Sequence, residues 1–173
     1  KLIEVKAKSF DSTDSNIFVG KRGGLQAGWK FYLFDLAFQK YVAQLTYPHL
    51  EFEAYLYLAD KSKVANINGL NQYFRVPKDG DPRKEVIIPQ EKVEDIIDSN
   101  VLSEINVDDI INDILNNKHK IYNELSFSNV VSQFLDWYQK DIFPAQEIVY
   151  SSCKTCEFKA TENQLNEGFL CGY

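Results

Sequence analysis

The sequence predicts an α/β fold, because strand-like and helix-like segments alternate along its first part. Residues 1–8 alternate apolar and charged side chains, as a strand does. Residues 29–47 repeat apolar side chains at helical spacing, and residues 51–58 return to an apolar strand pattern. This order is typical of a layered α/β core, and 173 residues suffice to form one as a single domain.

The predicted helix over 29–47 is apolar around much of its circumference. Its apolar side chains form two adjoining stripes, Phe34, Phe38, Tyr41 and Leu45 beside Leu33, Leu36 and Ala37. We therefore expect the helix to be buried on more than one side and to end at Pro48. Asp35 and Gln39, four residues apart, form a polar strip on this otherwise apolar helix.

The rest of the chain is predicted to be mainly helical before a loop-rich end. We expect an edge strand or extended segment at 71–76, a turn at 77–82, and helices with apolar stripes at 107–115 and 130–138. Asn106 is the expected N-cap of the first of these helices. The single domain then consists of a strand–helix–strand core over 1–76, a helical part over 90–140 and a cysteine segment over 150–173.

Composition limits the partners that the chain can have. A net charge of −6 gives the surface no general attraction for phosphate backbones, so any contact with nucleic acid must be local. The sequence contains no apolar run of membrane-spanning length and no signal-peptide pattern, so we expect a cytoplasmic protein without a membrane partner. A start inside a strand and the absence of methionine indicate a fragment of a longer protein.

Three cysteines lie close together at the end of the chain. Cys153 and Cys156 form a C-x2-C pair and Cys171 follows, a pattern typical of a metal or iron–sulfur site rather than a disulfide framework. Reduced structural thiols are the alternative. His49 and His119 are interpreted as surface residues, because each stands at a polar helix end.

The opening strand carries Glu4 and Lys6 on one face. A strand glutamate can bind Mg²⁺, the backbone carbonyl of Val5 can supply a second oxygen, and the lysine can orient water or stabilise developing charge. An amphipathic strand with one solvent face produces the same E-x-K pattern and is the alternative.

Four segments in order resemble the RecB-like branch of the PD-(D/E)XK nuclease superfamily, which includes AddB-type nucleases and CRISPR-associated RecB-like exonucleases. They are "LIEVKAKS", "DLAFQKYVAQL", "LNQYFRV" and "SSCKTCEFKA…EGFLCGY". The resemblance implies a restriction-endonuclease-like core, a mixed sheet flanked by helices. It would be incomplete at its N-terminus and would carry a helical insertion and a C-terminal cysteine segment.

The resemblance also implies roles for individual residues. Glu4 would be the metal-binding carboxylate, with the Val5 carbonyl beside it, Lys6 the catalytic lysine and Gln39 the helix glutamine that faces the active site. The metal would be Mg²⁺ or Mn²⁺. The family's tyrosine four residues after the glutamine is absent, since position 43 is Ala. The acidic residue of the preceding strand would lie upstream of Lys1, so we expect the fragment alone to be inactive.

By the same resemblance, Cys153, Cys156 and Cys171 would be three of the four thiolates of a [4Fe–4S] cluster in the full-length protein, with zinc as the alternative metal. The implied function is metal-dependent hydrolysis of DNA, including single strands, in repair, recombination or defence, together with a helicase or recombination partner. Two alternatives remain open. One is a non-catalytic nucleic-acid-binding or interaction module with the nuclease fold, and the other is a zinc-stabilised structural domain.

Overall fold

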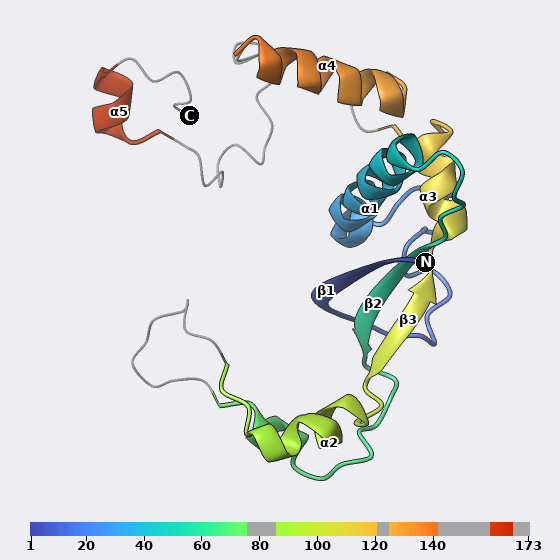
Figure 1. The fold of residues 1–173 in the computed structure, drawn as a ribbon, viewed down its shortest axis with the longest axis vertical. Coiled ribbons are helices and arrows are strands. Elements are labelled where there is room, and N and C mark those ends of the chain that lie inside the picture. The colour runs from blue at the N-terminus through green and yellow to red at the C-terminus, as the bar shows by residue number, and fades with distance from the viewer. Residues whose placement is uncertain (76–85, 121–124, 142–159, 168–173) are drawn as a thin grey trace. The chain divides into compact units, whose positions relative to one another are not determined.

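The computed structural model describes residues 1–75, 86–120, 125–141 and 160–167 (Figure 1). The chain divides into two compact units, residues 1–127 and residues 128–173. Within the described ranges, no helix is both long enough and apolar enough to cross a bilayer.

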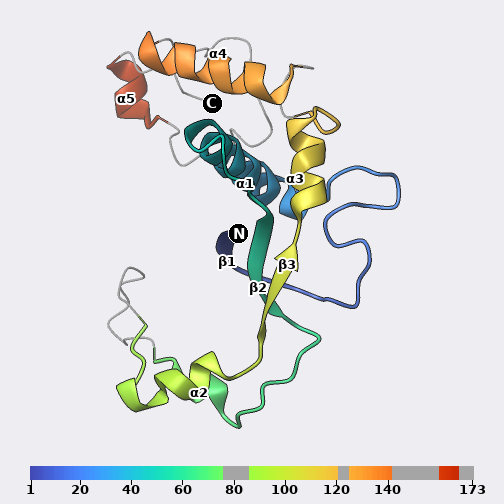
Figure 2. The same cartoon turned by 45° about the vertical axis from the view of Figure 1, so that its right-hand side comes forward.

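The first unit is built on a three-stranded mixed sheet (Figures 1 and 2). Its strands are β1 (Leu2–Phe10), β2 (Ala54–Asp60) and β3 (Leu102–Asn106), in the spatial order β1-β2-β3. β2 pairs parallel with β1 and antiparallel with β3. The predicted α/β class and the mixed sheet flanked by helices are therefore confirmed.

Helix α1 (Ala27–Thr46) connects the two parallel strands, and it packs on the sheet together with α3 (Asp108–Leu115) (Figure 2). The buried side chains between them form the core: Leu33, Leu36 and Ala37 of α1, Leu56 and Leu58 of β2, and Ile111 and Ile114 of α3, all 0% exposed. The prediction that α1 is buried on more than one side holds in part: Phe34 of the second stripe is 6% exposed and α1 also contacts α3, whereas Phe38 and Leu45 are 46% and 66% exposed. The stripe that faces the sheet is the one that contains Leu33, Leu36 and Ala37.

For the middle of the chain, one prediction was wrong and another holds in part. The part over 90–140, predicted to be helical, contains strand β3 between the short helix α2 (Val93–Ile97) and α3. The segment predicted as an edge strand or extended segment at 71–76 begins in a 3₁₀ helix, η1 (Leu70–Tyr73), after which Phe74 is extended and Arg75 forms a bridge with Ile87, and residue 76 lies outside the described residues. A second 3₁₀ helix, η2 (Gln90–Lys92), precedes α2. The turn predicted at 77–82 lies outside the described residues.

The prediction that Asn106 is the N-cap of α3 was wrong by one residue, although its side chain does contact the start of the helix. The backbone N–H of Asp108 donates to Asn106 Oδ1 across 2.8 Å, although the helix begins at Asp108 and the cap position is Val107. In the remaining part of the chain, α4 (Phe127–Gln139) corresponds to the helix predicted at 130–138. Helix α5 (Glu162–Asn166) lies where a loop was predicted.

Candidate functional site

In the first half of β1, Glu4 and Lys6 face α1, whereas Ile3 and Val5 face solvent. The side chains of Glu4 and Lys6 are 23% and 21% exposed, whereas Ile3 and Val5 are 44% and 67% exposed. A strand with a solvated polar face would show the opposite pattern. The interpretation of Glu4 and Lys6 as an ordinary solvent face was therefore wrong.

The spacing of residues on β1 and α1 explains how the two elements meet. Two residues along a strand span about 6.6 Å, and four residues along a helix span about 6 Å. Glu4 and Lys6 are two apart on β1, and Asp35 and Gln39 are four apart on α1. A helix that runs antiparallel to the strand therefore places Gln39 at Glu4 and Asp35 at Lys6.

The contacts follow this spacing, and the four residues form what we call the Glu4–Lys6 cluster (Glu4, Lys6, Asp35 and Gln39). Lys6 Nζ lies 2.7 Å from Glu4 Oε1 and 2.7 Å from Asp35 Oδ2. Gln39 Nε2 donates to Glu4 Oε2 across 3.2 Å and more weakly to Asp35 Oδ1 across 3.4 Å. The structure thus brings together the three residues singled out in the sequence. Asp35, which the sequence marked only as a polar neighbour of Gln39, joins them.

The electrostatics of the cluster set the charge of Lys6. Hydrogen bonds to Asp35 and then to Glu4 raise the pKa of Lys6 above its ordinary value. The ammonium group of Lys6 in turn lowers the pKa of Asp35. Lys6 is therefore a cation and Asp35 an anion at neutral pH, so Lys6 can orient or stabilise negative charge but cannot accept a proton.

Glu4 and Asp35 are the residues of the cluster that could hold a hard divalent cation, although each of them pairs with the Lys6 ammonium group. Mg²⁺ is usually held by one or two carboxylates and keeps several waters. Glu4 and Asp35 provide two carboxylates that converge on one point, the Lys6 ammonium group, and the side chain of Asp35 remains 45% exposed. Among the described residues no group of three Asp, Glu, His or Cys side chains gathers at one place. A role for the Val5 carbonyl stays a prediction.

β1 is irregular at the cluster. Val5 pairs with Tyr57 and Ser9 pairs with Ala59, so four residues of β1 advance against two of β2. A bulge of this kind bends a strand and changes the direction of its side chains. Here it falls between Val5 and Ser9, and so includes Lys6 of the cluster.

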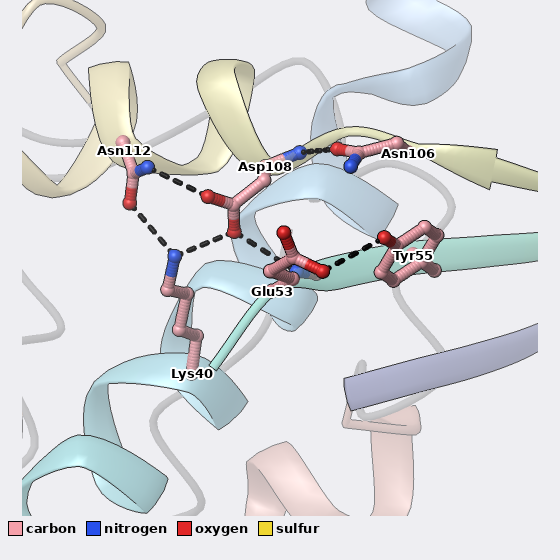
Figure 3. Close-up of polar contacts among 7 residues, drawn as sticks. Lys40, Glu53, Tyr55, Asn106, Asp108 and Asn112 are labelled. Atoms are coloured by element: carbon pink, nitrogen blue, oxygen red, sulfur yellow. Dashed lines mark hydrogen bonds and ion pairs between the residues drawn. The ribbon is translucent and has the colours of Figure 1, made fainter. Parts of the chain in front are cut away.

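A buried ion pair fixes the rotation of α1 (Figure 3). Lys40, next to Gln39, is 2% exposed, and its Nζ lies 2.6 Å from Asp108 Oδ1 and 2.8 Å from Asn112 Oδ1. Asp108 Oδ1 also accepts a hydrogen bond from the backbone N–H of Ala54 across 2.9 Å. The pair therefore ties α1 to the start of β2 and to the first turn of α3, which holds Gln39 toward Glu4. Sequence reasoning missed Lys40, because a lysine on a helix is normally solvated.

The remaining sequence candidates are the cysteines and the two histidines. Cys153, Cys156 and Cys171 lie outside the described residues. His49 is exposed, as predicted, and His119 is half-buried. Comparison of the chain with protein-family models, curated proteins and solved structures finds no match.

Proposed function

We propose that the Glu4–Lys6 cluster is the catalytic centre of a RecB-like PD-(D/E)XK nuclease, which hydrolyses DNA phosphodiester bonds with Mg²⁺ or Mn²⁺. One observation carries this proposal. Lys6 is held 2.7 Å from one oxygen of Glu4 while Gln39, from the next helix, donates to the other oxygen across 3.2 Å. An amphipathic strand with one solvent face explains the E-x-K pattern. It does not explain why Glu4 and Lys6 face Asp35 and Gln39 on α1. The mixed sheet with a parallel β1–α1–β2 unit is compatible with a restriction-endonuclease-like core.

Each side chain has a distinct task in this proposal. When bound, a divalent ion would supply a nucleophilic water and would polarise the scissile phosphate. The carboxylates of Glu4 and Asp35 would hold that ion, and Gln39 orients the Glu4 carboxylate through its hydrogen bond. Lys6 stabilises the negative charge that develops on the phosphate oxygens, because its raised pKa keeps it protonated.

The direct test is cleavage of labelled DNA by the full-length protein. Lys6→Ala is expected to lower the rate of Mg²⁺-dependent cleavage by about 10²-fold or more, the typical effect of losing one transition-state donor. Lys118→Ala is the matched control, since Lys118 pairs with Asp113 at a site that is 67% exposed at the lysine. Undiminished cleavage by Lys6→Ala would refute the assignment. DNA binding without cleavage by the wild-type protein would instead identify a non-catalytic module.

The proposal extends to the cysteines. Cys153, Cys156 and Cys171 are assigned to a [4Fe–4S] cluster in the full-length protein, on the sequence pattern alone. Anaerobic purification followed by iron analysis and visible absorption spectroscopy is expected to show iron and a charge-transfer band. Zinc without iron would contradict this assignment and favour a zinc-stabilised domain. DNA, including single strands, and a helicase or recombination protein are the proposed partners.

A further inference from the structure

We infer that Tyr32 is a positioning residue of the Glu4–Lys6 cluster. Its aromatic ring holds the Lys6 ammonium group through a contact that metal binding at Glu4 and Asp35 leaves intact. The inference rests on the proposed function and deepens it, because it names what keeps Lys6 at the site once its two carboxylate partners are engaged.

Lys6 and the proposed metal share the same two carboxylates. Lys6 Nζ lies 2.7 Å from Glu4 Oε1 and 2.7 Å from Asp35 Oδ2. A divalent cation held by these carboxylates competes with the ammonium group, because both are positive and both bind carboxylate oxygens. Lys6 therefore needs a further partner that the metal does not take. An aromatic ring is such a partner, since Mg²⁺ prefers oxygen ligands.

Tyr32 lies on the polar strip of α1, one turn before Asp35. It precedes Asp35 by three residues and Gln39 by seven, so the three side chains project from one side of the helix. Because α1 runs antiparallel to β1, this strip continues past Lys6 toward the end of the strand. Lys6 Nζ lies over the Tyr32 ring at 5.5 Å from its centre, within the roughly 6 Å of a cation–π contact.

The ring of Tyr32 is itself held in place. Lys8 Nζ lies 4.9 Å from its centre. The Trp29 ring meets it at an interplanar angle of 60° and a centroid distance of 6.1 Å, and Trp29 in turn packs against Phe18 at 5.1 Å. Trp29 and Phe18 are 8% and 9% exposed, so the support of the ring belongs to the core. The ring therefore keeps its place when the charges around Lys6 change.

The contact can be measured at Lys6 in the full-length protein with labelled lysine. An aromatic ring displaces the NMR signals of nearby protons, so the ε-methylene protons of Lys6 are expected to be displaced from ordinary lysine values. They should stay displaced after addition of Mg²⁺ alone. The signal is assigned by its absence in Lys6→Arg. Nuclear Overhauser effects between these protons and the Tyr32 ring test the contact in the wild-type protein.

Variants show whether the ring or the hydroxyl of Tyr32 matters. Tyr32→Phe keeps the ring and should keep the displacement of the Lys6 signals, whereas Tyr32→Leu should abolish it. In the DNA cleavage assay, Tyr32→Leu is expected to lower kcat about two- to fivefold without raising KM, the size of one cation–π contact. Tyr32→Phe should cleave as the wild type does. Phe31→Leu is the matched control, since it removes an 81% exposed ring from the neighbouring position, and circular dichroism checks each fold.

Four results would overturn the inference. They are no Overhauser effect between Lys6 and Tyr32, equal Lys6 signals in the wild type and Tyr32→Leu, return of these signals to ordinary values with Mg²⁺, and an unchanged kcat in Tyr32→Leu.

The carboxyl carbon signals of Glu4 and Asp35 separate this inference from the proposed function. If Mg²⁺ leaves them unchanged while Tyr32 contacts Lys6, the metal site and the nuclease proposal fail and the role of Tyr32 remains. Cleavage that depends on Lys6 but is indifferent to Tyr32 removes this inference alone.

Discussion

The ammonium group of Lys6 lies 2.7 Å from Asp35 Oδ2, so an ion pair joins the middle of β1 to α1. The same ammonium group lies 2.7 Å from Glu4 Oε1. Both carboxylates raise the pKa of Lys6, Asp35 more strongly than Glu4. The proton affinity of Lys6 therefore depends on a residue of the helix as well as on its own strand.

Asp35→Asn is expected to lower the pKa of Lys6. The substitution removes the stronger of the two carboxylates that favour the charged form, so Lys6 loses its proton at a lower pH than in the wild-type protein. An NMR titration of ¹⁵N-labelled lysine side chains measures this shift directly. Asp113→Asn, which removes the partner of Lys118, should leave the Lys6 titration unchanged. A Lys6 titration that does not move in Asp35→Asn would show that the ion pair is not formed in solution.

Gln39→Leu is expected to weaken Mn²⁺ binding and DNA cleavage by about 10- to 100-fold, because the Glu4 carboxylate loses the hydrogen bond that orients it. Isothermal titration with Mn²⁺ measures the first effect and a cleavage assay the second. Gln44→Leu is the matched control, since Gln44 is an exposed glutamine of the same helix. Equal behaviour of the two variants would deny Gln39 a role at the site.

Asp108→Ala is expected to lower the free energy of unfolding by about 3 kcal/mol, because Lys40 is then left buried without its carboxylate partner. The double variant Lys40→Met with Asp108→Ala should recover part of this loss. Urea unfolding followed by circular dichroism measures the free energy of unfolding of the wild type, the single variant and the double variant. Asp109→Ala, the exposed neighbour, serves as the control, and an effect of Asp108→Ala no larger than its own would contradict the prediction.

Asp60→Asn is expected to destabilise the protein at neutral pH but not in strong acid. Burial raises the pKa of Asp60, but hydrogen bonds from Ser62 and Ser12 more than offset burial and hold it well below its usual value. The ionised form therefore stabilises the fold above the unfolded pKa of about 3.9, and this stability is lost as the pH falls below it toward the folded pKa. Thermal unfolding at several pH values should show the difference between Asp60→Asn and wild type shrinking below about pH 4. The exposed Asp98→Asn is the comparison, and a constant deficit for Asp60→Asn across this range would disprove the mechanism.

The sequence predicted β1, α1 and β2 because each has a local signal. β1 alternates charged and apolar side chains, α1 repeats apolar residues at helical spacing, and β2 contains a continuous apolar run. The meeting of Asp35 and Gln39 with β1 was also foreseeable in part, since their spacing of four places them on one side of the helix. The sequence could not show which face of β1 packs against α1.

Features that depend on distant partners were missed. β3 has an exposed Leu102 and Glu104 and no strong alternation, and its backbone pairs with β2, far away in the sequence. Lys40 looks like a surface lysine until Asp108 and Asn112 are brought to it by α3. Phe38 is exposed because it lies on the side of α1 that neither the sheet nor α3 covers. In each case tertiary contacts, rather than local preference, decide the outcome.

The inward charges of β1 have a consequence for protein engineering. A slip of β1 by one residue would bury Ile3 and Val5 and release Glu4 and Lys6 to water, which hydrophobicity alone would favour. The observed register persists because α1 offers partners to both charged side chains. Substituting Asp35 and Gln39 by apolar residues would leave the charges of Glu4 and Lys6 beneath α1 without partners on the helix. Grafting or resurfacing of this region must therefore treat strand and helix as one inseparable module.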